Sequence, residues 1–200
     1  MYLSNGNMKL KGDTKNQFII WSLPACITCP FKTALCEKYC YAKKAERMYK
    51  NTRVSRNQNL VDSLQDDFIE RIKYLIIEKA NPNKKIWFRI HEGGDFYSVE
   101  YVNKWIEIAK AFPTITFMAY TKSIDFIGDT LPKNFVTRFS IWSDTKKSML
   151  DKAVKRGILT YEAIPKKELS ERKEYHCIGD CQTCKVCYNS NIKAIVTGIH

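Results

Sequence analysis

Four cysteines lie close together near the start of the chain, at Cys26, Cys29, Cys36 and Cys40, in the spacing C-x2-C-x6-C-x3-C. Thiolates repel one another at such short separations unless they are crosslinked or share a cation. A single zinc ion is usually held by two short C-x2-4-C pairs that a longer linker separates, and this spacing fits that pattern poorly. An iron–sulfur cluster accepts ligands from an uneven, compact segment. The spacing therefore predicts an iron–sulfur cluster, with zinc as the alternative metal.

A second group of four cysteines lies near the end of the chain, at Cys177, Cys181, Cys184 and Cys187. Its spacing, C-x3-C-x2-C-x2-C, is similar to the closely spaced ligand run of bacterial ferredoxins. Eight thiolates are twice what one [4Fe-4S] cluster accepts, so two clusters are favoured over one that both groups share. We also expect the two groups to be neighbours in space, because a segment after the last strand of an open barrel is the natural cover for its open side.

Composition and charge limit the class of protein that the sequence can encode. The 200 residues are long enough for one domain with a real core. No apolar run is long enough for a membrane helix, and the first residues lack the pattern of a signal peptide. We therefore expect a cytoplasmic protein with reduced thiols, and a secreted protein with four disulfides is the alternative. The net charge of +12 favours a polyanionic partner such as nucleic acid, although a basic surface can also serve solubility alone.

Five β–α alternations predict an α/β fold of parallel strands joined by crossover helices. The helices are expected near 54–80, 98–112 and 146–155, with Ser98 as the cap of the second, and Cys36 and Cys40 on one face of an earlier helix. The chain divides into a barrel unit at 1–165 and a Cys-rich extension at 166–200 that packs on it. The expected strands cover 17–23, 86–91, 114–120, 136–142 and 158–164, with a closing strand at 192–196.

Polar side chains alternate with apolar ones along the expected strands and share one face of the sheet. A parallel sheet covered by helices on both faces has nearly continuous apolar strands, so these polar residues favour a lumen that holds a ligand. We therefore expect a partial, open β/α barrel rather than an open doubly wound sheet. Arg89 and Arg138 need partners there, either Glu92, Asp95 or Glu162 or an anionic ligand. The polar face carries Arg89, His91, Tyr120, Lys122, Arg138 and Ser140.

The carboxyl ends of parallel strands meet at one rim, so residues just after each strand should gather near Cys26 to Cys40. His91 is a candidate metal ligand or proton shuttle, or an ordinary hydrogen-bonded histidine. The pair Gly93-Gly94 either cradles a ligand or makes a tight turn. Catalytic candidates are His91, Glu92, Asp95 and Lys122, cofactor-binding candidates are Gly93, Gly94, Ser140 and Asp144, and Ser143 is expected on the same rim.

The order of these elements resembles a radical S-adenosylmethionine (SAM) enzyme, with cluster cysteines after the first strand and Glu92-Gly93-Gly94-Asp95 after the second. More specifically, Cys-Tyr-Ala at 40–42, His-Glu-Gly-Gly-Asp-Phe at 91–96 and Tyr-Thr-Lys at 120–122 are similar to a phage-encoded family called gene product 88. The resemblance covers roughly residues 20–190. It implies a barrel-like iron–sulfur protein in the cytoplasm of a host cell, and it supplies no reaction.

SAM is a candidate cofactor, but the cysteine spacing departs from the radical-SAM pattern C-x3-C-x2-C. Cys36 and Cys40 begin that pattern and the third cysteine is absent, whereas the second group has the full spacing at the other end of the chain. A group whose four cysteines all ligate leaves no open iron for SAM. Two hypotheses follow: a redox or radical enzyme that needs an electron donor, or a non-enzymatic nucleic-acid-binding protein stapled by clusters or zinc. The sequence leaves the substrate and the oligomeric state open.

Overall fold

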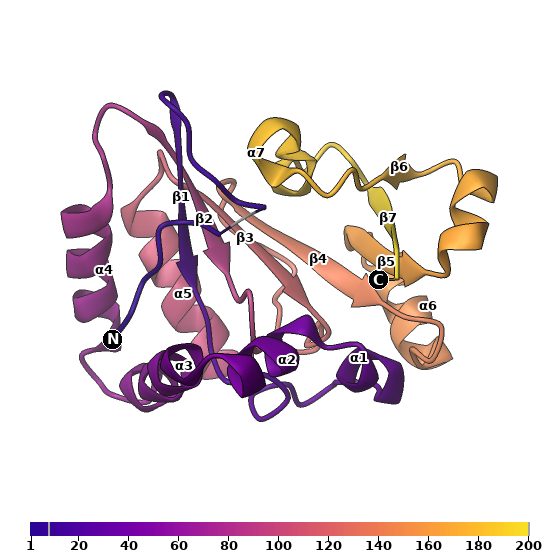
Figure 1. Cartoon of the computed structure of the whole chain (residues 1–200), viewed down its shortest axis with the longest axis horizontal. Helices are drawn as coiled ribbons and strands as arrows, with labels where there is room; N and C mark the ends of the chain where they lie inside the picture. The colour runs from indigo at the N-terminus through magenta and orange to yellow at the C-terminus, as the bar shows by residue number, and fades with distance from the viewer. Residues whose placement is uncertain (8, 200) are drawn as a thin grey trace.

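The computed structural model describes residues 1–7 and 9–199. A single curled sheet of seven parallel strands runs through it in the order β1-β2-β3-β4-β5-β7-β6 (Figure 1). This arrangement confirms a partial parallel barrel. The strands are β1 (Asn16–Trp21), β2 (Lys85–Ile90), β3 (Thr116–Thr121), β4 (Phe135–Ile141), β5 (Thr160–Ile164), β6 (Tyr175–His176) and β7 (Ala194–Gly198).

All six predicted strands are present, with bounds that differ by only a few residues from those expected. Their pairing is parallel throughout, and Ile19, for example, lies opposite Phe88. The closing strand is β7, which inserts between β5 and β6 rather than at the edge of the sheet. Residues from the Cys-rich end of the chain therefore complete the same sheet that the barrel strands begin.

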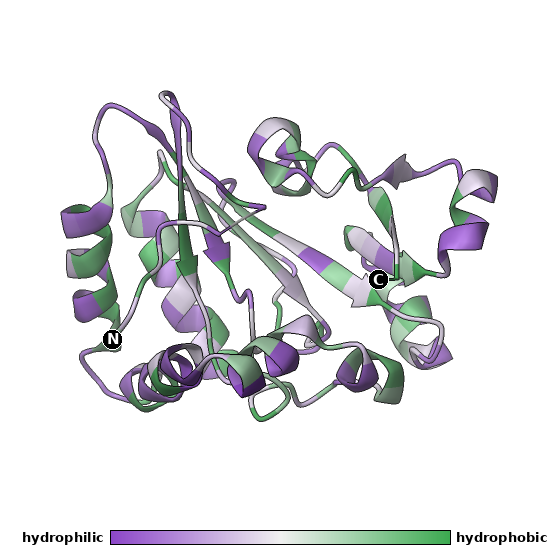
Figure 2. Cartoon of the chain, viewed as in Figure 1, coloured by the Kyte–Doolittle hydropathy of each residue, from purple (hydrophilic) through white to green (hydrophobic). Residues whose placement is uncertain are grey.

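Two helices, α4 (Phe68–Lys79) and α5 (Val99–Ala111), cover the outer face of the first strands. Trp105 of α5 packs on Trp21 and Phe88, with ring centroids 6.0 and 5.5 Å apart. The helix α5 begins as predicted, because the hydroxyl of Ser98 accepts a hydrogen bond from the backbone N–H of Tyr101. Figure 2 shows the corresponding pattern, with green strands beneath helices that are purple on part of their surface.

The single helix expected at 54–80 is wrong: the structure has α3 (Lys50–Ser63), a break, and then α4. Val61 and Leu64, which the apolar spacing of the expected helix 54–80 puts on its buried face, are more than half exposed. The buried face of α3 is polar instead, because it holds the start of the chain. Asn59 bonds the backbone of Tyr2 in both directions, and Asp62 pairs with the terminal amine at 2.7 Å. Apolar spacing alone could not show that this face packs through polar groups.

The inner, concave face of the sheet is partly covered by the second half of the chain. After α6 (Lys147–Lys155) and β5, the 3-10 helix η1 (Lys166–Glu171), α7 (Cys181–Cys184) and the 3-10 helix η2 (Val186–Tyr188) lead into β7. Tyr188 and Cys187 pack there against Phe18, Met118 and Val136. No helix in the described part of the chain is long and apolar enough to span a membrane.

Candidate metal centre

The first cysteine group occupies the loop between β1 and α2 (Tyr41–Met48), along the rim where the strands end (Figure 1). Cys36 lies in the short helix α1 (Ala34–Lys38), whose cap is the hydroxyl of Thr33. Cys40 lies outside that helix and caps α2, with its Sγ accepting from the N–H of Lys43 at 3.4 Å. The prediction of one helix face for Cys36 and Cys40 is therefore wrong, because the chain leaves α1 at Tyr39 and starts a new helix.

All eight cysteines are free thiols. Burial, together with the nearby Cys40 and Glu37, raises the pKa of Cys26 to about 11. Burial also raises the pKa of Cys29 and of Cys36, which are electrostatic neighbours of each other. Cys26, Cys29 and Cys36 are therefore neutral thiols, and their ionisation would need a compensating cation.

Within residues 1–7 and 9–199, no three Cys, His, Asp or Glu side chains converge closely enough to hold a metal ion. A multinuclear iron–sulfur cluster takes its ligands from a wider span than one ion does, and all four donors of the first group are the thiols that such a cluster uses. The chemistry of the donor set thus fits a cluster.

Asp95 stands beside this group at the start of the segment between β2 and α5. Its carboxylate is buried and accepts three hydrogen bonds, from the Thr121 hydroxyl at 2.6 Å and from the backbone N–H groups of Lys122 and Phe96. Burial nevertheless raises the pKa of Asp95 to about 6. Its negative charge in turn helps to raise the pKa of Cys29. Asp95 therefore lies beside the cysteine loop, at the rim where the sequence placed it, and its catalytic role stays a prediction.

Lys122 directly follows β3, and its ammonium group lies along the same rim. Its Nζ donates to the backbone oxygen of Ser140 at 2.5 Å and to the Ser140 hydroxyl at 3.3 Å. Burial lowers the pKa of Lys122, while Cys36, Asp95 and Asp144 act against that change. Asp144 accepts from the N–H next to Cys36, that of Leu35, at 2.8 Å. The ends of β3 and β4 are thus tied to the loop that carries the cysteines.

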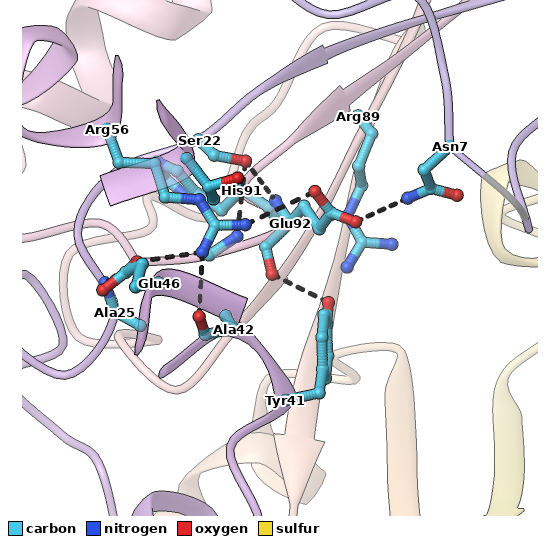
Figure 3. A network of polar contacts seen from close by, with 12 residues as sticks. Asn7, Ser22, Ala25, Tyr41, Ala42, Glu46, Arg56, Arg89, His91 and Glu92 are labelled. Atoms are coloured by element: carbon cyan, nitrogen blue, oxygen red, sulfur yellow. Dashed lines mark hydrogen bonds and ion pairs between the residues drawn. The ribbon is translucent and has the colours of Figure 1, made fainter. Parts of the chain in front are cut away.

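Glu92 is the centre of a polar network that joins the rim to α2 and α3 (Figure 3). Its carboxylate pairs with Arg56 at 3.4 Å and accepts from the amide of Asn7 at 2.5 Å. Its backbone oxygen accepts from the Tyr41 hydroxyl at 2.7 Å. Arg56 also pairs with Glu46 at 2.9 Å. Glu92 is therefore occupied in fixing α2 and α3 beside the cysteine loop.

The prediction that His91 lies on the polar, concave face is wrong, because its ring lies elsewhere. Its backbone has a positive φ of 66°, which turns the side chain toward the helix layer. The ring packs 4.8 Å from Phe96, and its Nε2 lies 3.1 Å from the hydroxyl of Tyr101. Burial, with a contribution from Arg89, lowers the pKa of His91 to about 3. The predicted strand 86–91 is expected to alternate its side chains between the two faces of the sheet, and this alternation fails at its last residue, His91.

The two glycines after β2 are explained by close packing. A Cβ on Gly94, which has a φ of +85°, would meet Leu23 and Thr28 at 2.6 Å. A Cβ on Gly93 would meet the guanidinium of Arg56 at 2.7 Å. Side chains of the protein itself therefore fill the space beside both glycines. The sequence suggested either a ligand cradle or a tight turn, and this geometry supports the tight turn.

The second cysteine group lies over the middle of the sheet, away from the rim of the first. Two tyrosine hydroxyls meet its thiols: Tyr120 donates to Cys187 Sγ at 2.7 Å, and Tyr175 lies 3.2 Å from Cys184 Sγ. Burial raises the pKa of Cys187 to about 11, although the Tyr120 hydrogen bond lowers it. In Figure 1, α7, which carries Cys181 and Cys184, lies on the opposite side of the sheet from α1, which carries Cys36, so the expected close approach of the two groups is not seen.

The side chain of Arg138 anchors the segment that carries the second cysteine group, by hydrogen bonds to the backbone of that segment. The guanidinium is fully buried and pairs with none of the acidic residues that the sequence suggested. It donates instead to four carbonyl oxygens, those of Cys187, Ile192, Val186 and Asn189, at 2.7–3.3 Å. Sequence reasoning missed this role, as it missed Arg56, because backbone carbonyls in a loop leave no mark in the residue pattern.

Comparisons with known proteins agree with the sequence resemblance. A family model described as "Gene product 88" matches residues 1–179. The Gene 88 proteins of Mycobacterium phages D29 and L5 are 35% and 36% identical over alignments of 106 residues, which cover 48% of this chain. The match spans less than half the length of these relatives, 42% and 43%. No solved structure matches. Because the family model covers most of its length, the chain belongs to the gene product 88 family.

Proposed function

We propose that the protein is an iron–sulfur protein and a redox or radical-SAM-like enzyme. Cys26, Cys29, Cys36 and Cys40 would hold a [4Fe-4S] cluster at the carboxyl-end rim of the half-barrel. The observation that carries the proposal is the position of these thiols beside Asp95 and Lys122, two buried titratable groups at the ends of neighbouring strands. Active sites of β/α barrels are built at this rim, from residues at the ends of several strands.

The chain's own residues would divide the work at this rim. A bound cluster would supply single electrons. Asp95, whose pKa of about 6 lies near neutrality, can exchange a proton at its carboxylate. Lys122 offers a buried positive charge that Ser140 orients through its backbone and side-chain oxygens. Glu92, held by Arg56 and Asn7, keeps α2 in place over the site.

Anaerobic purification with iron and sulfide analysis tests the cofactor. We expect brown protein that absorbs in the blue, and loss of about half of the iron when the first four cysteines are changed together to serine. A variant with Ser55→Ala, on α3 away from the thiols, controls for handling. Colourless protein with stoichiometric zinc would overturn the proposal.

The radical version has its own test. SAM binds an iron that lacks a protein ligand, so one of the four first-group thiols would have to stay off the cluster. Dithionite-reduced, fully loaded protein should then cleave SAM to 5′-deoxyadenosine. If loaded protein yields none, the radical version is excluded, and a redox function without SAM is the form of the proposal that stands.

A further inference from the structure

Arg89, on the concave face of β2, is a buried cation without an acidic partner. Its side chain is 8% exposed and takes part in none of the ion pairs among residues 1–7 and 9–199. Its Nε donates to the carbonyl oxygen of His91 at 3.1 Å, and the guanidinium lies 4.0 Å from the ring centre of Tyr120. The two terminal Nη groups donate to no atom in the described part of the chain. A fork of donors is therefore left open on the concave face.

The carboxylates that the sequence suggested for Arg89 are all engaged elsewhere. Glu92 pairs with Arg56 and Asn7, as Figure 3 shows beside the Arg89 side chain. Asp95 accepts its three hydrogen bonds at the rim, and Glu162 pairs with Arg172 at 2.6 Å. The thiols of Cys181 and Cys187 are electrostatic neighbours of Arg89, but burial raises the pKa of both and keeps them neutral. Because a buried charge without a charged partner is costly, an anion from outside the chain is the candidate partner.

A second unsatisfied polar group lies on the same concave face, against Trp87, which precedes Arg89 by two residues on β2. The Tyr188 hydroxyl is buried and has no hydrogen-bond partner, and the residue is only 5% exposed. Its ring is held by Phe18 and Trp87, with centroids 6.2 and 5.2 Å away. Burial raises the pKa of Tyr188, and the charge of Arg89 is the largest effect that opposes the rise. A cation with open donors and an unpaired hydroxyl thus share one location.

We propose that Arg89 and Tyr188 form an oxyanion subsite on the concave face, between the rim and the second cysteine group. Its ligand is the carboxylate or phosphate group of a small molecule, because the planar guanidinium fork matches two oxygens of such a group. Tyr188 would donate a further hydrogen bond, and the exposed ring of Tyr41, an electrostatic neighbour of Arg89, borders the approach. Anion binding needs no cluster; that this anion is part of the substrate rests on the proposed function.

The test measures anion binding to reduced, metal-free protein, so that failure of cluster loading does not affect it. Calorimetry with inorganic phosphate and with acetate, against chloride at equal ionic strength, separates the two ligand sources. We expect saturable binding of one of them, at one site per chain. Its Kd should rise at least tenfold in Arg89→Met and about threefold in Tyr188→Phe. Two controls, Arg71→Met on α4 and Tyr97→Phe beside Ser63, should leave the Kd unchanged.

Several outcomes would overturn the subsite. One is the absence of saturable binding for both anions, and another is equal affinity in Arg89→Met and the unchanged protein. If Arg89→Met does not fold, Arg89→Lys and Tyr188→Phe decide: unaltered affinity in both contradicts the proposal. Normal anion binding in Arg89→Met, together with a loss of iron after reconstitution, would show that the guanidinium serves a cluster instead and would overturn the subsite.

Discussion

The two cysteine groups have the same number of thiols and very different surroundings. The first lies in a loop at the carboxyl-end rim, beside the buried Asp95 and Lys122. The second lies over the middle of the sheet, where Arg138 binds its backbone and Tyr120 its thiol Cys187. A buried carboxyl group and a buried lysine flank the first, whereas tyrosine hydroxyls and Arg138 hold the second.

If both groups hold clusters, as proposed above, this contrast favours a division of labour between them. Groups with a shifted pKa cluster at functional sites, and β/α barrels build their active sites at the carboxyl ends of the strands. The first group is therefore the candidate reactive centre. Hydrogen bonds to cysteine sulfur and a fixed backbone tune and position a metal centre without contributing chemistry. The second group therefore suits electron transfer or a structural staple. The predictions below change one side of this comparison and use the other side as its reference.

The largest effect is expected on iron content. Cys29→Ser and Cys181→Ser, one from each group, should each remove about half of the bound iron if there are two separate clusters. Loss of all iron from either single replacement would show one cluster that both groups share. Iron and sulfide analysis of anaerobically reconstituted protein makes the measurement, and Ser55→Ala serves as the reference.

The next effect concerns the anchor of the second group. Arg138→Met leaves four buried carbonyl oxygens without their donor, so we expect unfolding to become easier by at least about 3 kcal/mol in urea. Iron bound to the second group should fall while that of the first is kept. Arg172→Met, which breaks two partly exposed ion pairs, with Glu162 and Glu174, should cost less, about 1 kcal/mol. Equal losses in the two variants would contradict the anchoring role.

Much of the fold followed from local pattern, and the failures have a common physical cause. Alternating apolar residues placed β2 and β4, and Ser98 marked the start of α5, because these signals act within one element. The polar face of α3 and the carbonyl contacts of Arg138 depend on segments far away in the sequence. Such pairings have no local signature.

The candidate site shows the same limit. The cysteine groups and the rim position of Asp95 and Lys122 could be predicted, because parallel strands place their ends together. The side-chain direction of His91 could not, since a single residue with positive φ reverses the alternation. The open fork of Arg89 was foreseen only as one of several alternatives, and the position of each carboxylate was needed to choose among them.

Two buried groups near the first cysteine group should give opposing pH dependences. Asp95, whose pKa is raised to about 6, contributes stability below its unfolded pKa that is lost as pH rises to 6. His91, whose pKa is lowered to about 3, contributes stability above pH 6.5 that is lost as pH falls. Between about pH 4 and 6 the two contributions nearly cancel.

Single replacements separate the two contributions. In His91→Asn, stability should fall with rising pH by about 1.4 kcal/mol per unit between about pH 4 and 6, because Asp95 remains. In Asp95→Asn it should rise by about the same amount, because His91 remains. Asn is chosen at position 91 because it tolerates positive φ. Urea unfolding of metal-free protein across this range measures both slopes, and parallel curves in the two variants would contradict the assignment.

The smallest effect is expected from one hydroxyl of the second group. Tyr120→Phe removes the donor to Cys187 Sγ and should lower stability by about 1 kcal/mol, the usual net value of one hydrogen bond. In reconstituted protein the change should lower the reduction potential of the second centre only, because a hydrogen bond to a ligating sulfur favours the more negative, reduced state. Tyr97→Phe, whose hydroxyl meets Ser63 far from the thiols, should leave both potentials unchanged. A shift in the first centre instead would mean that the two groups are electronically one site, and the division of labour between rim and sheet would then be wrong.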